Sequence, residues 1–320
     1  MSRYERFDLG RTRRYSVTGR PSKVSIEALG HPLESDRLSD FLDSLPDLLA
    51  GRKLRQLLAK MRRARELKKP LIWGFGGHVI KVGLGPILID LMDRGFISAM
   101  ATNGSGIIHD FELSCWGKTS ENVEEQIGSG QFGMARETGQ WINEAIGRGV
   151  GEGKGIGESI GAFLDGRETA HGEVSVSLQA WRRAVPLTVH MALGTDIIHC
   201  HPEASGEALG LGSMRDFEIF THQVSRLDGG GVYLNLGSAV ILPEVFLKAL
   251  TVVRSSGLEL KDFTTANLDF IQHYRPTQNV VQRPVLESGT GIALTGHHEL
   301  LVPLLAALLI YGEPDGAAEP

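Results

Sequence analysis

From Pro70 onward, the sequence alternates short apolar runs that end in glycine or small polar residues with stretches of helical periodicity. The apolar runs are PLIWGFG, FISAMATNGSG, GTDIIH, GGGVYLNLGS and LKDFTTANLDF, and the helix-like stretches include PILIDLMDRG, DFEIFTHQVSRL and PEVFLKALTVVRSSG. Apolar strands separated by helices are typical of a parallel sheet that is covered on both faces. The sequence therefore predicts an α/β fold with a three-layer, doubly wound, mostly parallel sheet of the Rossmann-like kind, in which ligands bind at the carboxyl ends of the strands.

The first part of the chain lacks this alternation. Residues 1–37 have weak periodicity and many charges, and we interpret them as an arm that lies on the body of the protein or on a neighbouring subunit. Residues 38–69 have apolar side chains three and four apart, which predicts two or three helical pieces with breaks at Pro46 and Gly51. The apolar run at residues 300–311 contains Pro303 and is too short to cross a bilayer, so it predicts a buried helix. We therefore expect an arm, residues 1–37, and one α/β nucleotide-binding domain with a helical N-terminal segment, residues 38–320.

Composition and charge narrow the class of protein. Of the 320 residues, 42% are hydrophobic and 22% are charged, as in an ordinary globular domain. The formal net charge is −5, and the basic residues at positions 52–69 alternate with apolar ones at helical spacing, which argues against a nucleic-acid surface. The N-terminus lacks the apolar core of a signal peptide, and Cys115 and Cys200 give no disulfide framework. We expect a cytoplasmic protein that binds neither nucleic acid nor a membrane.

Two glycine-rich turns are candidate ligand sites. WGFGGHVIKVGLG does not meet the dinucleotide pattern G-x-G-x-x-G, because the third glycine counted from Gly74 would fall at Val79. It remains a strand-to-helix turn whose N–H groups could face a phosphate, although a purely structural turn explains it equally well. In ATNGSGIIHDFE, the polar groups of Thr102, Asn103 and Ser105 follow a strand, and the neighbouring His109 and Asp110 form either a structural hydrogen-bonded pair or a catalytic one.

The segment GTDIIHCHPE concentrates versatile side chains. If it is a strand, alternation places Asp196 and Cys200 on one face and His199 and His201 on the other. An H-x-H pair on one face is a legitimate metal half-site, with His190, His222 or His109 as the candidate third ligand. The same residues could instead be acid/base or substrate-binding groups, because histidine titrates near neutrality. GHHEL, residues 296–300, is interpreted as a helix cap beside the buried helix.

Four of these pieces, in order over roughly residues 70–270, resemble the deoxyhypusine synthase family and its bacterial relatives. GHVIKVG resembles that family's Ser-Asn-Leu-Ile-x-x-Gly turn, and TNGSG resembles its Thr-Ala-Gly-Gly loop. LGSMRDFEIF resembles its Gly-Ser-x-x-Asp segment, and GGGVYLN resembles its Gly-Gly-Gly-Val-x-Lys motif. By this match the family's imine-forming lysine falls at Leu234, which cannot act as a nucleophile. The acidic stretch that grips spermidine is shortened to HQVSRLD.

The resemblance implies a doubly wound NAD-binding fold, a homotetramer with active sites between subunits, and an amine substrate. It also implies two sets of site residues. The set expected to bind NAD is Gly77, His78, Gly83, Thr102, Asn103, Gly104, Ser105, Asp216, Gly230 and Asn267. The set expected to act on the substrate is Asp196, His199, His201, His222 and His109.

Three functions follow as hypotheses. The leading one is an NAD-dependent enzyme of the deoxyhypusine synthase-like kind that acts on an amine or amino-acid-like substrate but does not synthesise deoxyhypusine. The alternatives are a metal-dependent hydrolase that uses His199 and His201 with His190 as a third ligand, and a non-catalytic NAD-binding regulator. We also predict a homotetramer or homodimer in which residues 11–15 of the arm pack against another chain, because a long arm is ordered only when contacts offset its conformational entropy.

Overall fold

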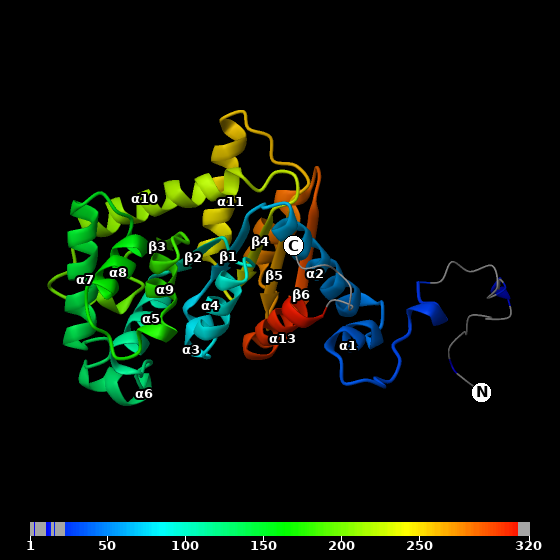
Figure 1. The fold of residues 1–320 in the computed structure, drawn as a ribbon, viewed down its shortest axis with the longest axis horizontal. Coiled ribbons are helices and arrows are strands. Elements are labelled where there is room, and N and C mark those ends of the chain that lie inside the picture. Colours follow the sequence, from blue (N-terminus) through cyan, green and yellow to red (C-terminus); the bar gives the residue numbers. More distant parts are fainter. Residues whose placement is uncertain (1–2, 4–10, 14–15, 17–22, 313–320) are drawn as a thin grey trace.

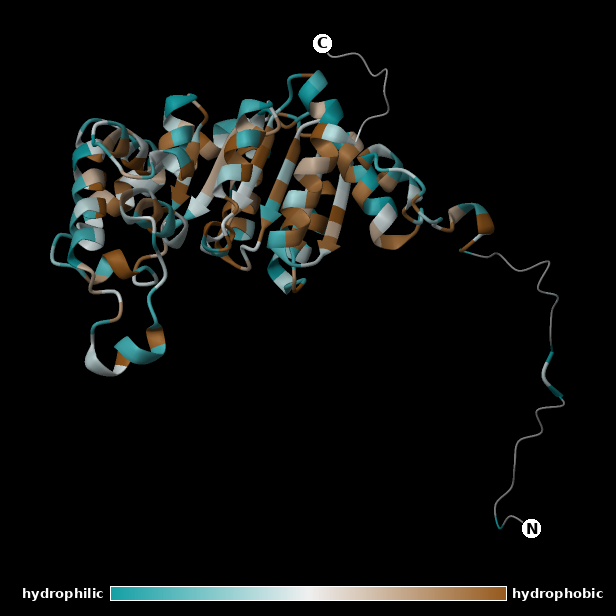
Figure 2. Ribbon diagram, turned by 60° about the horizontal axis from the view of Figure 1, so that its bottom comes forward, coloured by the Kyte–Doolittle hydropathy of each residue, from teal (hydrophilic) through white to brown (hydrophobic). Residues whose placement is uncertain are grey.

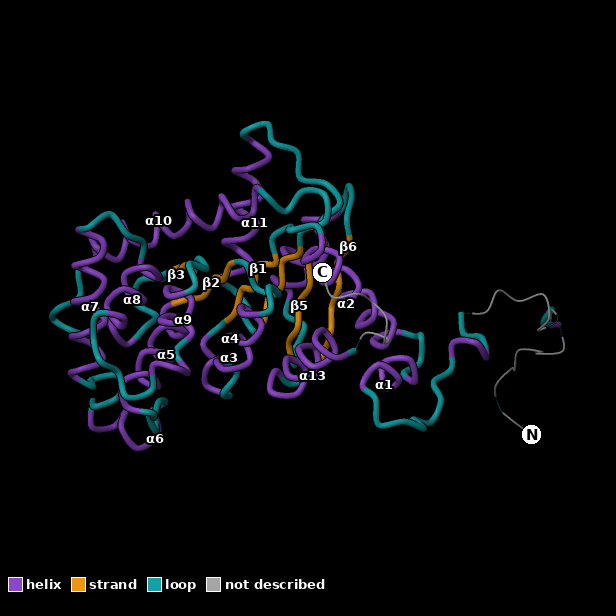
Figure 3. The backbone as a smooth tube through the Cα atoms, in the orientation of Figure 1, coloured by secondary structure: helices purple, strands orange, loops and turns teal. Residues whose placement is uncertain are grey.

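The computed structural model describes residues 3, 11–13, 16 and 23–312. One sheet runs through the molecule, and helices cover both of its faces (Figures 1 and 3). The six strands are all parallel and lie in the order β3-β2-β1-β4-β5-β6, which confirms the predicted doubly wound fold. Their bounds are β1 Leu71–Phe75, β2 Ala99–Asn103, β3 Leu187–His190, β4 Val232–Leu236, β5 Thr264–Asp269 and β6 Thr290–Thr295.

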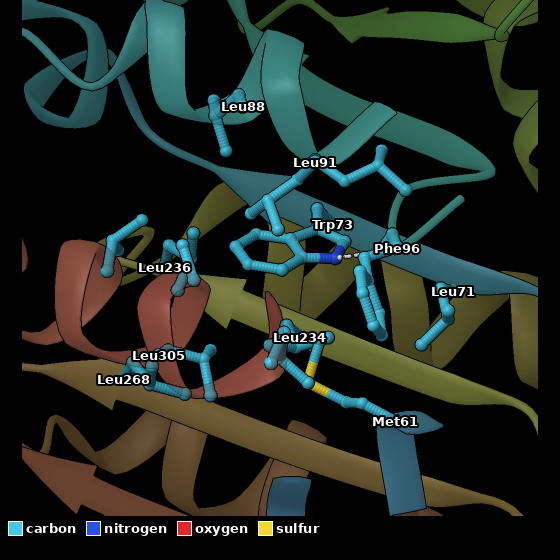
Figure 4. Close-up of a cluster of buried hydrophobic side chains, with 14 of the residues drawn as sticks. Met61, Leu71, Trp73, Leu88, Leu91, Phe96, Leu234, Leu236, Leu268 and Leu305 are labelled. Atoms are coloured by element: carbon cyan, nitrogen blue, oxygen red, sulfur yellow. Dashed lines mark hydrogen bonds between the residues drawn. The ribbon is translucent and has the colours of Figure 1, made fainter. Parts of the chain in front are cut away.

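Both faces of the sheet are buried because successive side chains of each strand enter different cores. Trp73 of β1 and Leu234 of β4 enter the first core, whereas Ile72 and Tyr233 enter the second. The first core is covered by α2 (Leu49–Glu66), α4 (Gly85–Asp93) and α13 (His298–Tyr311); Figure 4 shows its centre, where Trp73 Nε1 donates a hydrogen bond to the carbonyl of Phe96. The second core is covered by α10 (Gly206–Ser225) and α11 (Ile241–Ser255).

A third core lies beyond the β3 edge of the sheet and joins helices of the middle of the chain. These helices are α5 (Gly104–Trp116), α7 (Arg136–Gly151) and α8 (Ile156–Asp165), with α9 (Val176–Arg182) packed against α8. The short α6 (Val123–Gln126) lies in the connection from α5 to α7. Figure 2 shows the strand arrowheads on one side of the molecule and the segment around α6 projecting on that same side.

The predicted helices before the sheet are confirmed, with one change. The first is α1 (Leu38–Ser44), and Pro46 separates it from α2, as expected. Gly51 does not break α2; it lies near the start of this helix, where a Cβ would come within 2.2 Å of the carbonyl of Pro46. The predicted buried C-terminal helix is α13, which contains Pro303. No helix of the described ranges has the length and apolarity needed to cross a membrane.

Part of the predicted arm is attached to this helical segment. The backbone N–H of His31 donates to the carbonyl of Ser44, and that of Asp47 donates to the carbonyl of Ala28, so residues 28–31 lie along the α1–α2 connection. A 3-10 turn, η3 (Ile26–Ala28), precedes this contact. Of the residues 11–15 expected to touch a neighbouring chain, Arg14 and Tyr15 lie outside the described residues, and their packing stays a prediction.

The short segments that follow the sheet's strands differ most from expectation. GTDIIH is not a strand: Ile197–Cys200 form a 3-10 turn, η6, and the third strand is LTVH of β3. The strand β6 was not expected either. Between β5 and β6 lie α12 (Tyr274–Pro276), the π-helical turn η7 (Thr277–Gln282) and the 3-10 turn η8 (Arg283–Val285).

Candidate functional site

The strand order creates a switch point between β1 and β4. The chain leaves β1 toward α4 on the first face and leaves β4 toward α11 on the second, so the two connections diverge at the carboxyl edge of the sheet. In open α/β sheets, ligands bind outside the carboxyl ends of the strands at such a point. We therefore built the candidate site from the residues that follow each strand.

The turns after β1 and β4 are in direct contact. Gly76 follows β1, and its N–H donates to the carbonyl of Leu236 at 3.1 Å; Gly237 follows β4 with φ of 62° and donates to the carbonyl of Leu268. A Cβ on Gly76 would lie 3.0 Å from the carbonyl oxygen of Gly237. The two turns thus pack closely against each other with little room for a side chain on Gly76, and the pair forms the floor of the switch point.

Gly77 and His78, two of the residues expected to bind NAD, follow β1 at this edge. Both belong to the first turn of α3 (Gly77–Lys81), where backbone N–H groups lack intrahelical acceptors. Gly77 is packed so closely that a Cβ would come within 2.3 Å of Ser105 Oγ, whereas the His78 side chain is exposed. Gly83 lies farther along, after α3, with φ of 82° and open space around its Cα, so the structure explains it as a turn residue.

The polar residues after β2 are at the edge but are already engaged. The Thr102 hydroxyl donates to the carbonyl of Phe75, and Asn103 caps α5 by accepting from the N–H of Gly106. Ser105 Oγ also donates to Asn103 Oδ1. Gly104 lies against the carboxylate of Asp196: a Cβ on this glycine would be 2.2 Å from Asp196 Oδ2. The fold thus brings Asp196, from the segment after β3, to the end of β2. Burial raises the pKa of its carboxyl group.

His199 and His201 do not form the expected pair. In η6 the imidazole of His199 turns back, and its Nδ1 accepts from the backbone N–H groups of Gly194 and Asp196. His201 Nε2 instead lies 2.8 Å from the carbonyl of Gly133. The prediction of two histidines on one strand face is therefore wrong, because the segment is a 3-10 turn.

The three histidines of the metal alternative do not come together. His190 is buried at the end of β3, where its Nε2 lies 3.1 Å from Thr188 Oγ1 and burial lowers its pKa to about 3. It does not gather with His199 and His201 into a set of metal ligands. Within the part of the chain that the structure describes, no three His, Cys, Asp or Glu side chains gather so that they could hold a metal ion.

His109 and Asp110 are not a pair. His109 Nδ1 lies 2.7 Å from Thr119 Oγ1, which in turn donates to the carboxylate of Glu112 at 2.6 Å. Burial, with a smaller effect of Lys81, lowers the pKa of His109 to about 4. Asp110 points away from His109 and anchors the start of α9 by accepting from backbone N–H groups there.

His222 is exposed in the last turn of α10, which leads toward the amino end of β4, so the structure does not place it with the other candidates.

Two residues expected to bind the cofactor lie away from the β1–β4 switch point. Asp216 is buried on α10, where Oδ2 accepts from the N–H groups of Gly157 and Val189 and so joins the start of α8 to the outer edge of β3. Gly230 has φ of 119° in the turn that precedes β4, at the amino end of the sheet. The triple glycine therefore lies at the opposite end of β4 from the switch point, and the glycine that follows β4 is Gly237.

Asn267 lies near the carboxyl edge of the sheet, at the centre of a network of side-chain amides. Asn235 Nδ2 donates to Asn267 Oδ1 at 2.7 Å and also to the carbonyl of Ser238, while Asn267 Nδ2 donates to Gln272 Oε1. Gln272 Nε2 in turn donates to the carbonyl of Leu294 at 3.1 Å. The network ties the segments after β4 and β5 to β6, so the role supported for Asn267 is to hold these segments in place.

A cluster that sequence reasoning did not assign to the site lies at the ends of β5 and β6. Asp269 ends β5, Phe270 follows it, and His297 and His298 follow β6. The ring of His298 lies 5.5 Å from that of His78, and His298 Nε2 lies 3.8 Å from Asp269 Oδ1. The missed signal is the run TGIALT before GHHEL: read as a strand, it would have placed both histidines at the carboxyl edge.

Comparisons with known proteins support the fold. No protein-family model matches the chain, and no curated protein sequence matches it. Among solved structures, the ternary complex of AgrE with ornithine and NAD+ superimposes with a TM-score of 0.51 and 14% identity over 82% of this chain and 34% of that one. This chain therefore spans about a third of the length of AgrE.

Two further structures are matched over more of their length. A Methanococcus maripaludis S2 protein assigned to the LOR/SDH group has a TM-score of 0.50 and 16% identity over 88% of this chain and 73% of that one. An Entamoeba histolytica protein assigned as a deoxyhypusine synthase has a TM-score of 0.50 and 12% identity over 90% of this chain and 99% of that one. The chain has a deoxyhypusine synthase-like fold.

Proposed function

We propose that the protein is an NAD-dependent enzyme that acts on an amine or amino-acid-like substrate, with the cofactor bound across the β1–β4 switch point. The observation that carries the proposal is the Rossmann strand order with Gly76 and Gly237 in contact at the switch. The likeness to AgrE, which was solved with ornithine and NAD+, and to the deoxyhypusine synthase fold supports the choice of cofactor and substrate class.

The residues at the edge fit a dinucleotide. Rossmann proteins bind the pyrophosphate at the turn that follows β1, and here Gly76 and Gly77 form that turn. Rossmann proteins place a carboxylate near the end of β2 for the ribose hydroxyls, and here β2 ends in Asn103, which carries an amide in place of a carboxylate. Asp196 supplies the carboxylate instead, because it lies against Gly104, the first residue after β2.

A place for a flat ring lies past the ends of β3 and β4, on the face that α10 and α11 cover. An open hollow of about 350 Å³ is lined largely by apolar side chains of the β3 end, α10 and the start of α11, including Met191, Phe217 and Ile241. Such linings receive aromatic ligand groups. When bound, NAD would supply the oxidation of the substrate; the chain's own residues orient the two molecules and exclude water around them.

The assignment of Asp196 predicts a specific effect on cofactor affinity. Asp196→Asn keeps the size of the side chain and its ability to cap η6, but it removes the charged acceptor for the ribose hydroxyls. We expect NAD to bind about tenfold more weakly or worse, since a hydrogen bond to a charged group contributes about 1.5 to 3 kcal/mol. Isothermal titration calorimetry of the full chain with NAD measures this.

Asp216→Asn is the matched control. It is the same isosteric change at another buried aspartate, beside the outer strand β3 and away from the switch point, and we expect NAD affinity within twofold of the unchanged protein. Wild-type protein that shows no heat of binding with millimolar NAD would overturn the proposed function. Equal affinity of Asp196→Asn and wild type would overturn the role of Asp196. Appearance of reduced-nicotinamide absorbance with a primary amine distinguishes an enzyme from a non-catalytic NAD-binding regulator.

A further inference from the structure

Four rings and one carboxylate gather at the carboxyl ends of β5, β6 and β1; we call this group the ring box, and its members are His78, Asp269, Phe270, His297 and His298. The ring of Phe270 lies 6.0 Å from that of His297 in a stacked arrangement, 6.1 Å from that of His298 and 6.2 Å from that of His78. Phe270 is 46% exposed, so a face of the box is open to ligands.

His298 has one nitrogen without a partner at the centre of the box. Its Nε2 lies 3.1 Å from the carbonyl of Leu268, and because a carbonyl only accepts, Nε2 carries the proton of the neutral ring. Nδ1 therefore presents a lone pair, and it is buried without a hydrogen-bond partner. Gly237 fixes the ring from the other side, since a Cβ there would lie 2.8 Å from His298 Cε1. Buried polar atoms normally have partners, so this nitrogen is an acceptor that a donor from outside the chain can use.

The surroundings keep this imidazole neutral. Burial is the largest cause that lowers the pKa of His298 below its ordinary value, and His78 on α3 acts in the same direction. Asp269 on β5, Glu299 on α13 and the carbonyl of Leu268 act in the opposite direction. The ring is thus an acceptor at neutral pH, and it becomes a positively charged donor only when the pH falls through this lowered pKa.

We propose that the ring box binds the ammonium group of the amine substrate, a role that rests on the proposed function. An ammonium N–H would donate to His298 Nδ1, and the carboxylate of Asp269, whose Oδ1 lies 3.8 Å from Nε2 of the same ring, would lower the cost of holding a positive charge there. The exposed face of Phe270 adds a cation–π contact of the kind found in aromatic ammonium sites. His78 is the exposed ring beside His298, with 5.5 Å between the ring centroids, and because exposed side chains change rotamer within nanoseconds, it can move aside for the substrate.

The test is His298→Gln in the full chain. The glutamine amide can take over the bond of Nε2 to the Leu268 carbonyl, but it provides no atom in place of Nδ1. Binding of n-butylammonium and of L-ornithine is titrated by NMR, with and without saturating NAD. We expect wild type to bind both probes at millimolar concentration, and His298→Gln to bind them about tenfold more weakly with an unchanged melting temperature and NAD affinity. Wild-type affinity for both probes should fall as the pH drops below the lowered pKa of His298.

His273→Gln is the matched control, because His273 is an exposed histidine of the same region, and its affinity should equal that of wild type. Equal affinity of His298→Gln and wild type, or no binding of either probe to wild type, would overturn the ring box as an ammonium site. Loss of NAD binding alone, with the probes still bound, would overturn the proposed function and leave the ring box standing. If His298→Gln does not fold, Phe270→Leu carries the test at an exposed position, and an unchanged affinity there contradicts the proposal.

Discussion

Replacing Leu234 with lysine is expected to unfold the protein and not to create an imine-forming amine. Leu234 lies in the middle of β4, fully buried in the core that contains Met61 and Trp73 (Figure 4). A lysine there would bury a charge with no partner among these apolar side chains, or lose its proton at a comparable cost. The penalty of several kcal/mol is comparable with the whole stability of a domain, about 5 to 15 kcal/mol.

Thermal and urea unfolding followed by circular dichroism measure this effect. Leu234→Met is the control, because a change that conserves volume costs less than about 1.5 kcal/mol in a core. A folded Leu234→Lys variant with the wild-type melting temperature would show that this position is not in the core. Because position 234 is buried in the core, the residue there gives no information about imine chemistry.

Replacing Asp216 with alanine is the second change with a large expected effect. Asp216 Oδ2 accepts from two buried backbone N–H groups, those of Gly157 and Val189, and alanine leaves both without a partner. Each lost partner costs about 1 to 3 kcal/mol, so the free energy of unfolding should fall by roughly 2 to 6 kcal/mol. Asp216→Asn keeps an oxygen at this place and should retain most of the stability. Equal urea midpoints for Asp216→Ala and wild type would contradict this role.

The same aspartate predicts a pH dependence. Burial raises the pKa of Asp216 to about 7, from an ordinary value of 3.8. Between these values the folded chain holds a proton that the unfolded chain has released, so this group makes stability fall as the pH rises, by up to about 1.4 kcal/mol per pH unit. The stability of Asp216→Asn relative to wild type should therefore increase from pH 4 to pH 7. A difference that is constant with pH would contradict the raised pKa.

The fold could be predicted because the apolar runs themselves specify it. PLIWGFG and GGGVYLNLGS are apolar on both sides, as β1 and β4 require when both faces of the sheet are buried. Two strands were missed for physical reasons. LTVH of β3 has four residues, and TGIALT of β6 is the partly exposed strand at the sheet's edge, so neither shows a long apolar run.

The site was harder to predict, because it depends on which end of a strand a motif occupies. Gly77, His78 and Gly104 follow their strands and lie at the carboxyl edge, whereas Gly230 precedes β4 and lies at the opposite end. GTDIIHCH combines β-branched residues with histidines and so favours a strand on its pattern alone. In the fold, Asp196 and His199 cap a 3-10 turn instead, a tertiary outcome that periodicity does not encode.

The central claim is that the cofactor binds at the carboxyl edge of the sheet, across the β1–β4 switch point. Hydrogen exchange tests it most directly, because it maps the backbone segments that NAD protects. Exchange of the full chain is compared by mass spectrometry with and without saturating NAD. We predict slower exchange in the turns after β1 and β4, residues 76–79 and 237–240, and unchanged exchange in the triple-glycine turn at residues 229–231. Protection at residues 229–231 with none at the two switch-point turns would contradict the account.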